Sequence, residues 1–524
     1  MPPTTAFCRA HGVAHELEFK RRARDAGRIT YHMHVGLTDW PATEAAVRFV
    51  HDELAARGHT IERFGLCLDR AMGLPSEQRA AARRETGPRL DADDWAKVAA
   101  LPVQPHLGDH MIGTPASLEN TRAALAAGIT SIGNLGQFFA FEPPGGYDDT
   151  ELTRQVVRAI RAMAATDGTL VHSYLDDGPA VQFADYGMFA GWAALELYVV
   201  EELLGARLAH SYGGLIPEPL DRAAVGFALD DLRGRDSIGT MVYGNTVDYT
   251  SDHVRNTAVL ANYLLVDVGA QLHRPTGHAI NPVPLTEAER IPSAEEILEV
   301  QLLAREIERE ARRGAPLTDW AKLERHGADL ADAAARFRDH VLARLDDAGT
   351  DVRDPAAVLL ALRRAEPAEL EAGFSGGSQR PTWKAGIVAR EAARIARATP
   401  RLDGARVMLV VLEVHDVIRD ALARALTGAG ADVIVLSSAA TPAQVAAAAT
   451  QEDADAVVVG SYNGGALSLG RELRAGYDGL TIFGGILNED LGGEVPIDAR
   501  PGLEELGITV ADDAADVGRL IASR

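Results

Sequence analysis

Apolar and polar positions follow one recurring pattern over residues 28–310. A short apolar run, a polar turn and an amphipathic helical stretch succeed one another. The apolar runs are residues 28–35, 61–68, 103–109, 129–135, 168–175, 207–214, 237–245 and 270–278. Helical stretches between them, such as residues 42–58 and 151–168, end at glycine, a common helix stop. Strands that alternate with helices pair in parallel through right-handed crossovers. Eight such units in about 250 residues predict a (β/α)8 barrel, the TIM-barrel architecture.

Two further patterns follow the repeat. Long amphipathic helices rich in Ala, Leu and charge are expected in residues 311–400, together with a Gly-, Ser- and Pro-containing linker. From residue 401 five apolar strands alternate with helices over about 120 residues, which predicts a flavodoxin-like (Rossmann-like) α/β domain. The expected strands are residues 406–414, 432–437, 454–461, 480–485 and 508–510. The expected domains are an N-terminal extension (1–27), a catalytic barrel (28–310), a helical segment and linker (311–400) and a ligand-binding domain (401–524).

Composition narrows the class of protein. The chain has 524 residues, of which 47% are hydrophobic and 24% charged, as in globular proteins with more than one domain. A formal net charge of −23 argues against nucleic acid or an anionic membrane as a partner. Two cysteines, Cys8 and Cys67, are too few for a disulfide framework. With no signal-like or membrane-spanning pattern, we expect a cytoplasmic homodimer that acts on a small molecule.

Polar residues stand at the carboxyl ends of the predicted barrel strands, where TIM-barrel enzymes have their active sites. The candidate catalytic residues are His34, His106, Asp109, His172, Asp176 and Tyr212. The alternative is that strand-to-helix loops are polar in any case and supply helix caps.

The predicted small domain offers three loops at the carboxyl ends of its strands, where ligands bind on such sheets. They are Glu413-Val414-His415-Asp416-Val417-Ile418, then Gly460-Ser461-Tyr462, and finally Gly484-Gly485. Glycines let the backbone approach a bulky ligand closely. The alternatives are a receiver-like or a dinucleotide-binding domain, but the acidic cluster of the first and the G-x-G-x-x-G of the second are missing.

These loops resemble the cobalamin-binding domain whose signature is Asp-x-His-x-x-Gly, about 41 residues, Ser-x-Leu and later Gly-Gly. Residues 419–459, which are 41 positions, separate the first two loops. The resemblance implies that His415 binds the cobalt of cobalamin, with Glu413 fixing its tautomer. Glu413 replaces the Asp and Ile418 the Gly of the signature, and Gly460-Ser461-Tyr462 stands where the family has Ser-x-Leu. Ile418 is therefore expected to narrow the entry of the cofactor's tail.

The long N-terminal block resembles the large barrel subunit of glutamate mutase over about 350 residues. The matching stretches, in the same order, are residues 34–37, 103–106 with 113–115, 128–131, 177–179, 374–376 and 384–386. The resemblance implies an adenosylcobalamin-dependent mutase, a carbon-skeleton or related 1,2-rearrangement, in which the cofactor's Co–C bond breaks homolytically and a radical takes hydrogen from the substrate.

Carried over position by position, the resemblance assigns adenosyl contacts to Arg274 and His278. Asn134 and Gly136 fall in the loop that faces the corrin ring. The substrate pocket departs from the family, because His34 and His106 replace arginines that hold carboxylates. Carboxyl groups at Asp109, Asp176 and Asp177 would favour an amine, a hydroxyl-rich compound or a substrate with at most one carboxylate, so we expect no turnover of glutamate or 3-methylaspartate. The alternative is that Arg274 or Arg122 replaces the lost arginines.

Two other classes of function remain open. One is a metal-dependent barrel enzyme with a regulatory cobalamin domain, whose possible ligands are His32, His34, His106, Asp109, His172 and His210. His32 and His34 would share one face of a strand. The other is a non-catalytic cobalamin sensor or carrier.

Overall fold

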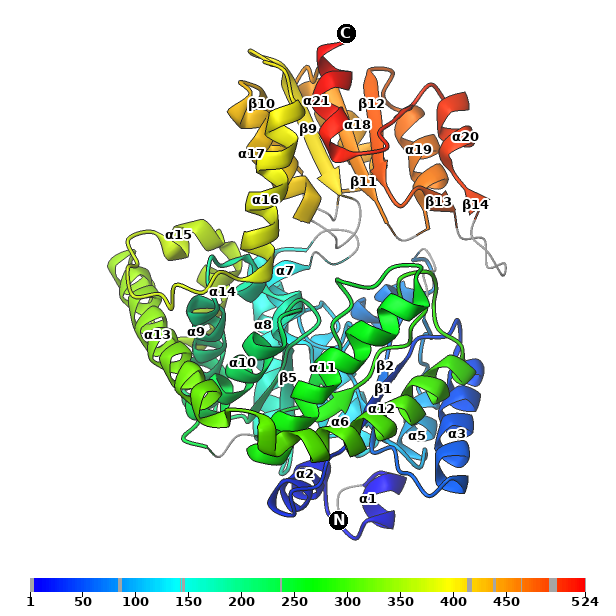
Figure 1. Cartoon of the computed structure of the whole chain (residues 1–524), viewed down its shortest axis with the longest axis vertical. Helices are drawn as coiled ribbons and strands as arrows, with labels where there is room; N and C mark the ends of the chain where they lie inside the picture. Colours follow the sequence, from blue (N-terminus) through cyan, green and yellow to red (C-terminus); the bar gives the residue numbers. More distant parts are fainter. Residues whose placement is uncertain are drawn as a thin grey trace. The chain divides into compact units, whose positions relative to one another are not determined.

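The computed structural model describes residues 4–82, 87–141, 143, 147–235, 238–411, 417–436, 440–462, 464–489 and 497–523. The chain divides into two compact units, residues 1–383 and residues 384–524. Each unit is of mixed α/β type and contains parallel β-sheet, as expected (Figure 1).

Eight parallel strands form the centre of the first unit. They are β1 (His32–Val35), β2 (Arg63–Leu66), β3 (Gln104–His106), β4 (Ser131–Ile132), β5 (Leu170–Tyr174), β6 (Leu208–Ser211), β7 (Met241–Tyr243) and β8 (Ala279–Asn281). Consecutive strands pair in parallel, through ladders or through the bridges Leu107–Ile132 and Tyr212–Val242. A parallel bridge between Tyr31 and Ile280 joins β8 to β1. The pairing is therefore cyclic.

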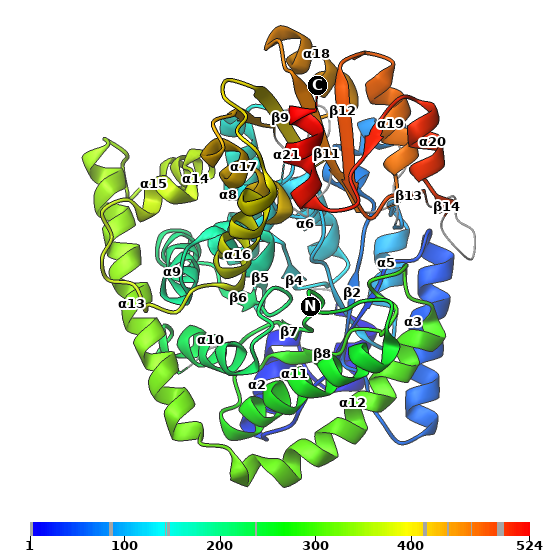
Figure 2. The same ribbon diagram turned by 45° about the horizontal axis from the view of Figure 1, so that its top comes forward.

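Two helices precede β1, at least one helix follows every strand, and together they surround the ring. They are α1 (Ala6–Ala10), α2 (Glu16–Asp25), α3 (Trp40–Ala56), α4 (Ser76–Arg79), α5 (Asp94–Ala99), α6 (Ser117–Ala126), α7 (Leu135–Ala140), α8 (Asp149–Ala164), α9 (Tyr186–Leu197), α10 (Pro219–Asp231), α11 (His253–His273), α12 (Ala294–Gly314), α13 (Trp320–Asp347), α14 (Pro355–Arg364) and α15 (Pro367–Glu371). Short 3-10 turns lie at Arg70–Gly73, Leu175–Asp177, Pro179–Gln182 and Ala315–Leu317, and a π-helical turn at Tyr198–Leu203 extends α9. The long helix α13 packs along α9 and α10, the helices that follow β5 and β6 (Figure 2).

Alternation along β1 separates the core from the ring interior. Met33 and Val35 are buried in one apolar cluster with Val47 and Val50 of α3. His32 and His34, at the alternate positions, stand on the opposite side of the strand. The hydrophobic core therefore lies between strands and helices, and polar side chains are left for the ring's interior.

The N-terminal extension closes the amino ends of the strands. Lys20, in α2, donates hydrogen bonds of 3.2 and 2.7 Å to the carbonyl oxygens of Thr240 and Gly277, which precede β7 and β8. Burial holds the pKa of Lys20 well below its ordinary value. This segment is therefore part of the ring's structure.

The prediction of a strand at residues 270–278 is wrong. Helix α11 continues through this stretch to His273, and β8 begins at Ala279. The apolar periodicity of the helix extends into the run and hides its end, while the true strand is only three residues long. His278 therefore precedes its strand instead of ending it.

The second unit is built on a five-stranded parallel sheet with the order β10-β9-β11-β12-β15. Its strands are β9 (Arg406–Val411), β10 (Asp432–Val435), β11 (Ala456–Ser461), β12 (Leu480–Gly485) and β15 (Thr509–Val510), each within or close to its expected run. A short antiparallel pair, β13 (Asn488–Glu489) and β14 (Ile497–Asp498), follows β12 and was not expected.

Helices cover both faces of this sheet. They are α16 (Trp383–Ala398), α17 (Val417–Gly428), α18 (Pro442–Gln451), α19 (Ala466–Arg474), α20 (Arg500–Glu505) and α21 (Ala514–Ala522). Residues of α16, α17 and α21 form one apolar cluster with the sheet, and residues of α18, α19 and α20 form another. Each face therefore has its own core.

We predict that residues 384–524 fold alone, because both cores lie within them. A fragment that begins at residue 401 should be less stable by roughly 2–4 kcal/mol, since it lacks Ala392 and Ile395, which are 5% and 0% exposed. It also lacks the ion pair between Lys384 Nζ and Asp420 Oδ2, which are 3.2 Å apart. Urea unfolding of the two fragments measures the difference, and equal midpoints and slopes would contradict it.

Candidate functional site

A buried ion pair stands inside the ring of the first unit. Arg63, in β2, and Glu16, in α2, have side chains that are each 1% exposed, and Arg63 Nε lies 2.6 Å from Glu16 Oε1. Arg63 Nη1 also donates a 2.8 Å hydrogen bond to the carbonyl oxygen of Thr240. A buried charge is strongly destabilising unless it is paired and hydrogen-bonded. Glu16 is therefore what stabilises a guanidinium at this position.

Arg63 fixes the tautomers of two histidines. Its Nη2 lies 3.0 Å from His106 Nδ1, and its Nη1 lies 3.4 Å from His32 Nδ1. A guanidinium only donates, so both Nδ1 atoms accept and both rings carry their proton on Nε2. Burial first, then the neighbouring histidine and Arg63, hold the pKa of both rings well below the ordinary value. Both are neutral, and neither Nε2 has a hydrogen-bond partner among the described residues.

Two more histidines complete a row of rings. Asn281 Nδ2 lies 3.1 Å from His34 Nδ1, so His34 also carries its proton on Nε2, and burial lowers its pKa to about 4. His172 has the opposite tautomer. The Thr240 hydroxyl donates to the carbonyl of His210, so Thr240 Oγ1 accepts from His172 Nδ1 at 3.1 Å. Burial lowers the pKa of His172 as well.

These contacts argue against a metal centre. Arg63 brings a positive charge to the row, and His210 points to the helices, where its Nε2 lies 3.0 Å from Glu196 Oε2 of α9. Among the residues that the structure describes, no group of three or more His, Cys, Asp or Glu side chains could hold a metal ion. The metal-dependent alternative gains no support.

Carboxyl groups gather at the carboxyl ends of β3 and β5. Asp109 Oδ1 is 3.5 Å from Gln137 Nε2, and Asp177 Oδ2 accepts a 2.8 Å hydrogen bond from Asn134 Nδ2. Asp176 Oδ2 accepts from the amides of residues 213 and 215 at 2.9 and 3.0 Å. Burial raises the pKa of Asp109 to about 6 and that of Asp177, with help from the neighbouring aspartates, to about 8. The pKa of Asp176 is also raised, mainly by burial.

The loop assigned to the cofactor holds this cluster in place. Asn134 caps α7, and its Oδ1 accepts from the amides of Gly136 and Tyr174, both at 2.8 Å. A Cβ on Gly136 would lie 2.5 Å from the Tyr174 carbonyl oxygen, so this position requires glycine. Asn134 thus ties β4 to β5 and to Asp177.

Three sequence-predicted residues lie elsewhere. Tyr212 directs its hydroxyl to Gly226 of α10, in the helix layer. Arg274 ends α11 and pairs with Asp230 at 2.6 Å. His278 precedes β8, with Nδ1 2.6 Å from Thr276 Oγ1. None stands at a strand's carboxyl end inside the ring, because α11 runs to His273, residues 274–278 precede β8, and Tyr212 follows its strand on the outward-facing register.

Sequence reasoning missed Glu16, Arg63, Gln137, Tyr174 and Tyr243. A signal existed for Arg63, since two adjacent charged residues, Glu62 and Arg63, interrupt an apolar strand run. Its partner could not be found, because Glu16 lies 47 residues away on a helix assigned to an extension.

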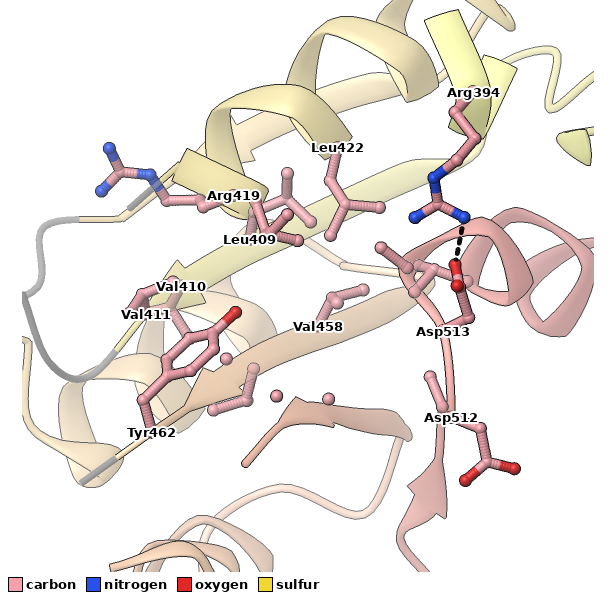
Figure 3. A pocket seen from close by; sticks show the side chains of 18 residues that line it. Arg394, Leu409, Val410, Val411, Arg419, Leu422, Val458, Tyr462, Asp512 and Asp513 are labelled. Carbon is pink, nitrogen blue, oxygen red and sulfur yellow. Dashed lines mark hydrogen bonds and ion pairs between the residues drawn. The ribbon is translucent and has the colours of Figure 1, made fainter. Parts of the chain in front are cut away.

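The second candidate site is a cavity of about 280 Å³ in the small unit. It lies at the carboxyl ends of β9, β11 and β12, between α17 and the start of α21 (Figure 3). Arg394 and Asp513 form an ion pair of 2.7 Å at one end, and Tyr462 stands at the other. Its walls are mainly apolar, contributed by residues such as Leu409, Leu422 and Val458.

Most of the predicted cofactor loops border this cavity. Gly460, Tyr462, Gly484, Gly485 and Ile418 line it, and Ser461 is paired with Gly485 in the sheet. Val417 begins α17 beside Ile418. Glu413, Val414, His415 and Asp416 lie outside the described residues.

Two glycines shape the cavity in different ways. At Gly485 the φ of +109° and the Ser461 carbonyl oxygen leave no place for a Cβ. At Gly484 the nearest atom to an added Cβ is the Ala511 carbonyl oxygen, at 3.7 Å, an ordinary van der Waals contact, so a side chain here would fit on the backbone and occupy part of the cavity that Gly484 lines. Gly484 therefore contributes volume to the cavity.

No protein-family model matches the sequence, and no curated protein is significantly similar to it. Within the described ranges, none of the helices has both the length and the apolar character that crossing a bilayer requires. The assignment of function therefore depends on the residues themselves.

We predict that Glu16→Gln destabilises the first unit by about 3–5 kcal/mol, because Arg63 keeps a buried charge without its counter-ion. Chemical denaturation measures the loss. The control is Glu53→Gln in the Arg57–Glu53 pair of α3, whose side chains are 46% and 40% exposed, with an expected cost below about 0.5 kcal/mol. Equal small losses in both variants would show that the buried pair is not needed.

Proposed function

We propose that the protein is an adenosylcobalamin-dependent radical isomerase, a carbon-skeleton mutase or a related 1,2-rearrangement enzyme. Its small polar substrate would be held in the first unit and its cobalamin in the second. The observation that carries the proposal is the apolar cavity bordered by Gly460, Gly484 and Gly485 at the carboxyl ends of β11 and β12.

The proposed folds fit this division of labour. A (β/α)8 barrel for the first unit is supported by the cyclic parallel pairing of its strands and by the helix that follows each one. A flavodoxin-like fold for the second is supported by the order of the strands across its sheet, β10-β9-β11-β12-β15. Numbered along the chain, this order is 2-1-3-4-5. In such sheets ligands bind where the strand order reverses, which here is between β9 and β11.

The cavity suits the nucleotide tail of a base-off cobalamin. It is mainly apolar, it is close to the lower end of the usual size of ligand pockets, and it extends between two helices toward the Arg394–Asp513 pair. Ile418 lines it, so this departure from the family signature narrows the slot without filling it.

His415, the predicted lower ligand, is close in sequence to residues that line the same cavity. Val411, which precedes residues 412–416, and Ile418, which follows them closely, both line it. Described residues on both sides of positions 412–416 therefore line the cavity. We assign the imidazole of His415 to the cobalt and Glu413 to its other ring nitrogen.

Adenosylcobalamin, when bound, supplies the hydrogen-abstracting radical chemistry. The chain's own residues would bind and orient the substrate. Neutral Nε2–H groups of His32, His34 and His106 are donors. Asp109 and Asp176 offer acceptor oxygens, and Asp177, mainly protonated at pH 7, can both donate and accept. Enclosure by the ring would keep water from a reactive intermediate.

We expect His415 nitrogen to be the lower ligand. Cob(II)alamin bound to protein that carries ¹⁵N-histidine should show ¹⁵N superhyperfine splitting in its EPR spectrum. His415→Ala should weaken binding strongly, and Glu413→Ala less. Splitting from the ¹⁴N of the cofactor's own dimethylbenzimidazole would refute the assignment.

We also expect Gly484→Leu to weaken cobalamin binding at least tenfold, because its side chain would enter the slot. Gly428→Leu is the matched control, since an added Cβ there meets nothing within 4 Å and the residue does not line the cavity. Titration followed by absorption spectroscopy compares the two. Unchanged affinity in Gly484→Leu would place the cofactor's tail elsewhere.

A further inference from the structure

Three carboxyl groups in the first unit lack a counter-ion. Asp109, Asp176 and Asp177 lie close enough that the charges of the other two raise the pKa of Asp177, and one amide, that of Gln137, stabilises both Asp109 and Asp177. Within the described ranges, none of the three forms an ion pair with Lys, Arg or His. Arg222, the guanidinium that acts on Asp176, is already paired with Asp267, with its Nε 3.0 Å from Asp267 Oδ1.

One oxygen of this cluster is buried without a partner. Asp176 is 7% exposed; its Oδ2 takes two backbone amides, while Oδ1 has no hydrogen bond among the described residues. Buried carboxylate oxygens almost always have a donor. A ligand that donates hydrogen bonds would supply the missing one.

Aromatic rings adjoin the carboxyl groups. Tyr174, whose hydroxyl bonds to Asp176, has its ring centroid 5.5 Å from that of Tyr243. The ring of His34 lies 5.1 Å from Tyr243, and its pKa of about 4 keeps it neutral. Ring faces attract ammonium groups, and a neutral imidazole does not repel them.

We propose that this acidic cluster, Asp109, Asp176 and Asp177 with Tyr174 and Tyr243, binds the ammonium group of an organic amine. That the amine is the substrate rests on the proposed function; that the cluster binds it does not. Ammonium supplies what the cluster lacks, a positive charge with three hydrogen-bond donors. Guanidinium or an alkali ion would offer the same charge with other geometry.

Binding should release a proton. Around Asp177 the titratable groups are Asp109 and Asp176, and beyond them the Cys67 thiol, the two tyrosines, Glu287 and Arg222. With a pKa near 8, Asp177 is mainly protonated at pH 7. A bound cation favours the ionised form, so affinity should rise about tenfold or more between pH 6 and pH 8.

Calorimetry on the full-length protein without cobalamin tests the proposal. The probes are 1,4-diaminobutane and butylamine, with butan-1-ol, butyrate and potassium chloride as size- and charge-matched comparisons. We expect the amines to bind, with proton release shown by heats that depend on the buffer's ionisation enthalpy. No binding of amines, equal binding of butan-1-ol, or tighter binding at pH 6 would overturn the proposal, and equal competition by potassium would make this an inorganic cation site instead.

Asp177→Asn separates binding from structure. An amide is close in shape to the protonated carboxyl, so the thermal midpoint should be retained while amine affinity falls at least tenfold and proton release disappears. Asp109→Asn should also lose affinity. Asp167→Asn is the control, because the Asp167 side chain is fully exposed. Unchanged proton release in a folded Asp177→Asn would refute the assignment, and amine binding in a protein that fails to bind cobalamin would leave this proposal standing while the isomerase falls.

Discussion

The interior of the first unit depends on the Arg63–Glu16 ion pair. A guanidinium inside a ring of strands is tolerable only with a buried counter-ion, and the counter-ion comes from α2, a helix outside the strand–helix repeat. Because Arg63 then donates to His32 and His106, one charge pair sets the tautomers of the rings above it. The N-terminal segment is therefore part of the candidate site's construction.

Toward the carboxyl ends of the strands, burial changes the ionisation of the side chains inside the ring. Burial pushes the pKa of His34 down to about 4 and that of Asp177 up to about 8, so at pH 7 both groups are mainly neutral. Asp109, with a pKa near 6, is mainly ionised. If an amine binds as proposed, its charge would favour further ionisation of the carboxyl groups, while the histidines remain neutral hydrogen-bond donors over the same pH range.

The sequence predicted most strands because their signal is local. The run of residues 480–485 coincides with β12, since an apolar strand between polar turns is recognisable without its neighbours. The prediction failed at residues 270–278, where helical periodicity runs into a three-residue strand. Positions inside the ring were harder to predict. His34 and His172 could be placed from alternation, but the outward orientation of Tyr212 and the Glu16–Arg63 contact depend on register and on a helix distant in sequence.

In the small unit, the spacing between the loops and the glycines within them carry different information. Between β9 and β11 the chain forms α17, β10 and α18, so the 41 residues from 419 to 459 are what one helix–strand–helix crossover of a doubly wound sheet requires. That spacing alone is therefore a statement about topology. The evidence for a ligand is at the loops that this crossover connects: Gly460 and Gly484 are partners in the sheet, a Cβ on Gly484 would meet no atom closer than 3.7 Å, and both glycines line one cavity. A binding domain needs that space, whereas a sheet with larger residues at these positions would have the same spacing and less room for a bulky ligand.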